Sequence, residues 1–472
     1  MPETPSPVPA ERVTGDWLSR VHGLLLVAAL VMVSLLNTSG PVPGTGWMPL
    51  FVPVCAVLLV ATLVVWVRRC RAEMSGASDS AGASDSAGAS GSLVRALGQS
   101  MPGPAWFCLA AATGLFGFAL ISSGLSHPVV WIGKALKPAD VPRMLVVFPA
   151  IEALLITWTS FAIIASVPAS RRFRLLWRMS VLLVPLSLLG WLRVWLEVGG
   201  SRLWTQMGGA AVYPVVLMAA FAVAVAGVLR GHRPHVSQVV ALCHLALLLL
   251  TGSRGAILMI VFFGVVAFVR LAREHTGLGE RLAVRSKWVY LLGGIGVVVA
   301  AFLSPILDRL DNGSAGRMMT WRIGWAAVTQ NWHTVLVGVG SGGIWPWFAY
   351  ESGWQPLPWR SRMIGPYGQT LYHSHSLYLE VMAELGLVGL VLLALVVLPI
   401  AVQWIRGGTI ANMVLTSVAC AALVGFAFDS YLFKNFSVSM VWWLVVFAVL
   451  STGHRETETS PAPPRVDAEA RR

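Results

Sequence analysis

Apolar runs, each close to the length needed to cross a bilayer, constrain this chain more than any other feature. A hydrocarbon core about 30 Å thick needs roughly 20 apolar residues per helix, and about 17 are tolerated. The runs are Val21–Leu36, Met48–Trp66, Ala105–Leu125, Met144–Val167, Met179–Val198, Ala210–Leu229, Val236–Leu250, Ala256–Leu271, Trp288–Ile306, Leu385–Ile405, Ala411–Phe428 and Ser437–Leu450. They predict an all-α polytopic membrane protein with about twelve transmembrane helices. A composition of 56% hydrophobic and 12% charged residues excludes a soluble globular chain.

Basic residues gather in clusters between these runs, and such clusters stay in the cytoplasm. Placing both termini inside puts the clusters on one side: Arg68, Arg69, Arg71, Arg95, Arg171, Arg172, Arg174, Arg178, Arg230, Arg233, Arg270, Arg273, Arg281, Arg285, Lys287 and Arg406. The opposite orientation would translocate every cluster, so we expect N-in and C-in topology. The net charge of +13 then reflects topology, and no nucleic-acid partner is expected.

The remaining segments differ in composition from the spans. A small-residue repeat, "ASDSAGASDSAG", follows the second run and is typical of a flexible linker. The predicted organisation is a cytoplasmic tail (1–20), nine spans (21–306, with a flexible cytoplasmic linker at 72–95), a long external loop (307–384), three spans (385–451) and a disordered cytoplasmic tail (452–472).

The long external loop is rich in tryptophan and is expected to be functional, because long ordered connections usually are. Its tryptophans fit anchoring at the membrane interface or stacking on sugar rings. Residues 316–332 carry Trp321, Trp325 and Val328 at helical spacing, which predicts an interfacial helix. Arg317 and Arg322 fall at the margins of that face, where they could bind a substrate phosphate or simply reach lipid headgroups.

Arg254 interrupts an apolar stretch within "TGSRG", between two predicted helices. Glycines there keep the backbone accessible, and the N-terminus of the next helix favours an anion. A guanidinium donates two parallel hydrogen bonds to a phosphate, so Arg254 is a candidate phosphate ligand, although it could simply mark the end of a helical hairpin. Arg202, at the outer end of the fifth span, is a second candidate because it lacks an oppositely charged neighbour on its own helix.

His375 lies at or near the predicted start of a helix, in "HSHSLYLE". Because its side chain titrates near neutrality, a histidine can take a proton from a sugar hydroxyl, although a lone histidine is more often structural. His373 could orient it, and Tyr378 is a further auxiliary candidate. Asp429 and Lys434 are interpreted first as buried-pair or packing residues. The acidic pair Asp308 and Asp311 is too weak for a magnesium or manganese site, so no metal and no cofactor are predicted.

The order of "TGSRGA", "GRMMTWRIGW", "GVGSGG" and "HSHSLYLEVMAELGLVGL" resembles the O-antigen ligase and polymerase-like superfamily over roughly residues 193–397. The resemblance implies a twelve-span enzyme of the bacterial inner membrane that acts at the periplasmic face. Its donor would be an undecaprenyl-pyrophosphate-linked glycan and its acceptor lipid A-core or another surface hydroxyl. Transfer would be metal-independent and invert the anomeric carbon.

Carried over by motif, the donor pyrophosphate would bind Arg254 and Arg317, with Arg322 as a close rival and Arg202 in support. His375 would be the base, although Ser376 stands where the family usually has asparagine. An O-antigen or exopolysaccharide polymerase and a protein O-oligosaccharyltransferase remain alternatives within the superfamily. A polysaccharide-lipid transporter or flippase is a more distant one, because no internal repeat of the spans is evident.

Overall fold

The computed structural model describes most of the predicted spans and part of the long loop. The described residues are 23–24, 26–27, 31, 48–81, 95–126, 129–132, 135–138, 143–199, 202–203, 205, 207–209, 211–274, 321–322, 324–344, 364–365, 368–369, 374–433 and 435–452. The predicted spans Val21–Leu36 and Trp288–Ile306 lie largely or wholly outside them, as do Arg317, His373 and Lys434.

Apolar helices dominate the described part of the chain. They are α2 (Met48–Ala81), α4 (Gly103–Leu125), α5 (Arg143–Ser166), α6 (Ala169–Val198), α7 (Pro214–Leu229), α8 (Pro234–Leu250), α9 (Arg254–Glu274), α13 (Leu377–Arg406), α14 (Ile410–Phe426) and α15 (Phe436–Thr452). Each falls on one of the predicted runs. Five of them are long and apolar enough to cross a membrane, and five are shorter apolar helices. The helical membrane class is therefore confirmed at this level.

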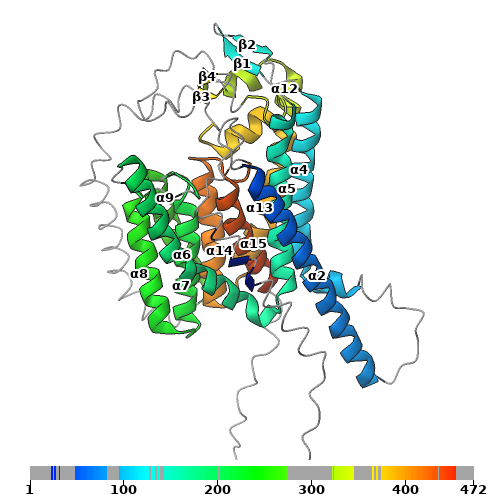
Figure 1. Cartoon of the computed structure of the whole chain (residues 1–472), viewed down its shortest axis with the longest axis vertical. Helices are drawn as coiled ribbons and strands as arrows, with labels where there is room; N and C mark the ends of the chain where they lie inside the picture. Colours follow the sequence, from blue (N-terminus) through cyan, green and yellow to red (C-terminus); the bar gives the residue numbers. More distant parts are fainter. Residues whose placement is uncertain are drawn as a thin grey trace, which may run out of the picture.

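The helices form one packed assembly with α14 and α15 at its centre (Figure 1). On one side α14 packs against α7 and α9, and on the other α15 packs against α5. α15 is apolar all round, which is typical of a helix buried on every side. Trp443 stacks on Phe447 at 5.3 Å, and Phe447 meets Phe161 of α5 edge-on at 5.2 Å. These rings pack α15 against α5.

α13 is broken rather than continuous. Gly386 has φ 63° and ψ −160°, so the helix changes direction after its first nine residues. We call residues 377–385 the half-helix. Its Glu384 end packs near the short helix α12 (Trp332–Val337), whereas its Tyr378 contacts the end of α14. The break therefore lays the half-helix across one end of the bundle and carries its N-terminus toward α14.

Three details differ from the sequence expectation. α2 continues to Ala81, into the repeat predicted to be a flexible linker. Two short antiparallel hairpins accompany the helices: β1 (Val129–Ile132) with β2 (Ala135–Pro138), and β3 (Ile364–Gly365) with β4 (Gly368–Gln369). In the loop, Val328 is buried whereas Trp325 is 59% exposed, so the two do not share one apolar face as predicted.

Candidate active site at the helix ends

His375 lies next to Ser376, the N-cap of α13, at the start of a helix as the sequence predicted. The helix begins there because Ser376 is its N-cap and accepts a hydrogen bond from Leu379 N at 3.4 Å. His375 has φ 58°, in the left-handed region that L-residues rarely adopt. Its side chain keeps 26% of its surface exposed, so the imidazole is held at the rim of the bundle with access to solvent.

Asp429, which follows α14, faces this histidine. Its Oδ2 lies 3.9 Å from His375 Nδ1, a distance typical of an electrostatic contact rather than a hydrogen bond. The carboxylate is 1% exposed, and its Oδ1 accepts a hydrogen bond from Ser430 N at 2.8 Å. A buried carboxylate beside one ring nitrogen orients an imidazole and stabilises its protonated form. Asp429 was interpreted first as a packing residue, because nothing local in the sequence connects it to His375.

The TGSRG turn lies at the start of α9, as predicted. Gly252 has φ 56° and ends the preceding helix. Ser253 Oγ accepts a hydrogen bond from Ala256 N at 3.4 Å, so Ser253 acts as the N-cap of α9. Arg254 is the first residue of the helix, where backbone N–H groups and the helix dipole favour an anion.

The turn and the histidine lie on either side of one short segment. A Cβ atom at Gly255 would be 3.7 Å from Cβ of Phe428, and the next residue along the chain is Asp429. Segments near residues 254, 375 and 429 are thus brought to one end of the bundle. At this end of the bundle, the structure thus places a histidine, a carboxylate beside it and the N-terminus of α9 near one another.

Arg202 is committed to the backbone of the same turn. Its Nε donates to Thr251 O at 2.9 Å, and its Nη2 donates to Gly252 O at 3.0 Å. Leu203 N also donates to Leu250 O at 3.0 Å. Carbonyls at a helix C-terminus lack partners within the helix, so these contacts complete the end of α8. Arg202 therefore braces the turn that carries Arg254.

The remaining predicted site residues divide into three groups. Tyr378 donates its hydroxyl to Leu423 O at 2.8 Å and so ties α13 to α14. Arg322 is exposed. In the predicted interfacial helix, residues 316–320 and 323 lie outside the described part of the chain. The side chain of Arg254, together with Arg317 and His373, lies outside the described part of the chain. Their placement in the site stays a prediction.

The second glycine motif, "GVGSGG" (338–343), packs against the break in α13. Val339 N and Gly340 N donate to Ala383 O and Glu384 O at 3.0 and 2.9 Å. Glu384 Oε2 accepts from Gly342 N at 2.9 Å. A Cβ atom at Gly338 would lie 2.2 Å from the backbone carbon of Glu384. The motif is a backbone junction that fixes one end of the half-helix.

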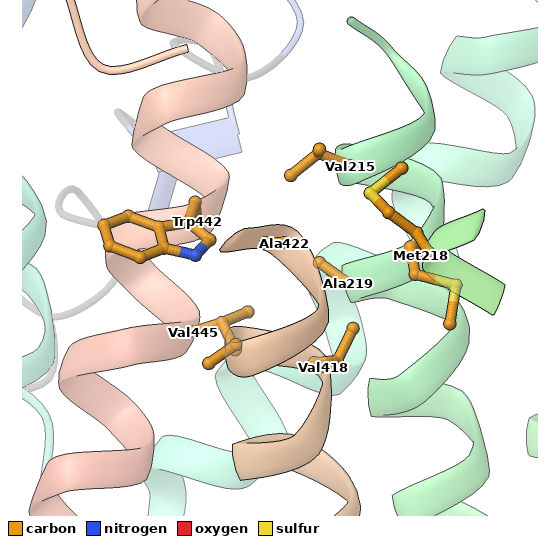
Figure 2. A pocket seen from close by; sticks show the side chains of 9 residues that line it. Val215, Met218, Ala219, Val418, Ala422, Trp442 and Val445 are labelled. Atoms are coloured by element: carbon orange, nitrogen blue, oxygen red, sulfur yellow. The ribbon is translucent and has the colours of Figure 1, made fainter. Parts of the chain in front are cut away.

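A small apolar cavity lies elsewhere, between α7, α9, α14 and α15 (Figure 2). Its lining includes Val215, Met218, Val418, Ala422 and Trp442. None of its lining residues is titratable, so it is a packing void rather than the reaction site. Within the described ranges, no group of three or more His, Cys, Asp or Glu side chains is placed to hold a metal ion.

The family model described as O-Antigen ligase matches residues 239–394. This segment is therefore similar to the O-antigen ligase family. The resemblance inferred from the motifs is therefore confirmed, and the matched segment includes Arg254 and His375 but ends before Asp429. A search among curated proteins found no match.

The family match and the apolar helices together indicate a bacterial membrane protein with a glycosyltransferase-like activity on glycan and lipid substrates. Three functional candidates emerge only from the fold: Asp429, Glu380 and Glu384. All are at most 2% exposed. In the sequence, these carboxylates could be noticed only because they stand in or beside apolar runs, where a charged group needs a partner.

Proposed function

We propose that this protein transfers a glycan from an undecaprenyl-pyrophosphate donor to a hydroxyl of lipid A-core or a similar surface acceptor, at the periplasmic face of the inner membrane. The observation that carries the proposal is the His375–Asp429 pair beside the first turn of α9. A base and an anion-binding helix terminus are the two elements that such a transfer needs. The twelve-span, N-in and C-in topology and the long external loop belong to the same proposal.

In the proposed reaction, His375 takes the proton from the acceptor hydroxyl through Nε2. The acceptor oxygen forms a bond to the anomeric carbon as the bond from that carbon to the phosphate oxygen breaks. The electron pair of the broken bond leaves on the pyrophosphate, and direct displacement inverts the anomeric carbon. Asp429, at 3.9 Å from Nδ1, stabilises the imidazolium that forms.

The charge that develops on the leaving pyrophosphate needs positive groups prepared in advance. We assign this role to Arg254 and to the N-terminus of α9, with Arg317 or Arg322 from the external loop. Arg202 contributes by bracing the turn. The chemistry assigned to these residues needs no metal, so we expect transfer to continue in the presence of a chelator.

The purified protein in lipid vesicles, supplied with a lipid-pyrophosphate glycan and an acceptor, tests this proposal. We expect His375→Ala to abolish transfer. Asp429→Asn should lower kcat by up to about 10⁴-fold, the loss known for a carboxylate that orients a catalytic histidine. His333→Ala is the matched control, because His333 is an exposed histidine of α12 and should keep full activity. Full transfer by His375→Ala would contradict the assignment of the base.

Deletion of the gene in its host separates the alternatives within the superfamily. Accumulation of lipid-linked polymer indicates a ligase, and single repeat units on the surface indicate a polymerase. Loss of glycoprotein indicates a protein O-oligosaccharyltransferase. Lipid-linked glycan trapped on the cytoplasmic side would instead indicate a flippase.

A further inference from the structure

The backbone of His375 is strained, and its neighbours hold it in place. Among the described residues, His375 and Arg233 are the non-glycine residues with positive φ, at 58° and 45°. An L-residue in this region brings its Cβ close to the following carbonyl oxygen. Such a conformation persists only where the surrounding contacts determine it, and it often marks a functional position.

The two serines on either side of His375 close a ring around it. Ser374 Oγ donates to Ser376 O at 2.5 Å and accepts from Ser376 N at 3.1 Å. One hydroxyl thus bonds both backbone groups of the residue after the histidine. Ser374 is fully buried and Ser376 is 7% exposed, so water competes little for these contacts.

Glu380 ties this ring to the half-helix. Its Oε2 accepts a hydrogen bond from Ser374 N at 3.4 Å, and the carboxylate is 1% exposed. Glu384, one turn further along, accepts from Gly342 N at 2.9 Å. The half-helix is therefore fixed at both ends by buried carboxylates, one on the turn around His375 and one on the GVGSGG junction.

We infer that Ser374 and Glu380 are positioning residues: they hold the left-handed backbone of His375 so that its imidazole faces Asp429. The inference rests on the role proposed for His375. Ser376, by contrast, contributes its side chain to the cap of α13, through Leu379 N. Its backbone N and O complete the ring, and any residue other than proline supplies the same backbone groups at this position.

This difference provides a matched pair of variants. Ser374→Ala removes the ring and should lower kcat about 10- to 100-fold, because a small misplacement of a catalytic group costs that much. The KM for the lipid-linked donor should stay unchanged, because His375 does not bind the pyrophosphate. Ser376→Ala removes the cap hydroxyl but keeps the ring, so it should lower kcat clearly less than Ser374→Ala does. Ser374→Thr, which restores the hydroxyl, should recover activity.

A second pair tests the anchor. Glu380→Leu removes the acceptor for Ser374 N and should reproduce the effect of Ser374→Ala, whereas Glu380→Gln retains a carbonyl oxygen and should keep more activity. Thermal unfolding of each variant separates a local effect from loss of the fold. Equal losses of kcat in Ser374→Ala and Ser376→Ala would overturn the inference, since a merely structural role affects both.

Acylation of histidine by diethyl pyrocarbonate, followed by peptide mass spectrometry, supplies a readout independent of activity. We expect faster acylation of His375 in Ser374→Ala than in the wild type, with buried His244 as an internal reference. An unchanged rate at His375 would overturn the inference. If His375→Ala kept full transfer while Ser374→Ala still accelerated acylation, the base role would fail and the positioning of the side chain would stand.

Discussion

Two glycine-bearing segments of this protein look alike in sequence and differ in what surrounds them. In TGSRG, a Cβ atom at Gly252 would meet Arg202 Nε at 3.5 Å, an ordinary contact distance. In GVGSGG, a Cβ atom at Gly338 or Gly342 would meet backbone atoms at 2.2 and 2.9 Å. The first segment opens a helix at the candidate site, whereas the second is filled by Glu384 and Val146. A Cβ atom is therefore sterically tolerated at Gly252 but not at Gly338 or Gly342, although both segments are rich in glycine.

The largest expected effect is at the junction. Gly386→Ala would place a Cβ atom 2.4 Å from the backbone of Leu336, at φ 63° and ψ −160°. Strain of about 1–3 kcal/mol adds to an overpacking cost of about 1–3 kcal/mol, so we expect the unfolding free energy to fall by about 2–6 kcal/mol, a large part of a typical total. Fluorescence-detected size-exclusion chromatography and thermal unfolding measure this.

Gly252→Ala is the matched control, because it also places alanine at positive φ but meets no backbone atom closely. It should cost about 1–2 kcal/mol of unfolding free energy and leave a folded protein. If the two variants were equally stable, the proposed difference between the segments would be wrong.

A smaller effect, on activity alone, is expected at Arg254. Arg254→Gln should lower kcat about 100-fold, since one lost donor to a developing anion costs this much. The melting temperature should not change. Arg193, exposed at the outer end of α6, supplies the control, and Arg193→Gln should transfer normally. Normal activity in Arg254→Gln would show that Arg254 and its turn are not part of the active site.

The smallest effect is expected at Arg202, and it should fall mainly on stability. Arg202→Gln removes two charge-assisted bonds to Thr251 O and Gly252 O and should cost about 1–3 kcal/mol of unfolding free energy. Activity should fall less than in Arg254→Gln. Denaturant unfolding and transfer rates on the same preparations check this. A loss of activity with unchanged stability would instead indicate that Arg202 binds the substrate phosphate directly.

Much of this arrangement could be predicted, because the signals are local. The apolar runs from Met48 to Leu271 and from Leu385 to Leu450 coincide with helices. The positions of Arg254 and His375 at helix starts follow from Ser253 and Ser376, whose side chains cap the helices that come after them. The donor roles of Arg254, Arg317 and Arg322 stay predictions.

Other features could not be predicted from local patterns. Arg202 had been expected to reach a phosphate, but its guanidinium binds two backbone carbonyls of the turn. Its local sequence gives no sign of this, because its partners lie about fifty residues away. The shape of α13 is equally hidden. The sequence predicted a loop up to residue 384 and a span from Leu385, whereas α13 runs across this boundary and breaks at Gly386.

The sequence by itself determined the membrane-helical class, the similarity of residues 239–394 to the O-antigen ligase family, and the helix starts at or next to Arg254 and His375. The tertiary structure decided that Asp429 faces His375, that Glu380 anchors the turn around it and that GVGSGG is a junction. The reason is physical: hydrophobic periodicity and capping act within one or two helical turns. Contacts between distant segments depend instead on how whole helices pack, and here on the single break at Gly386.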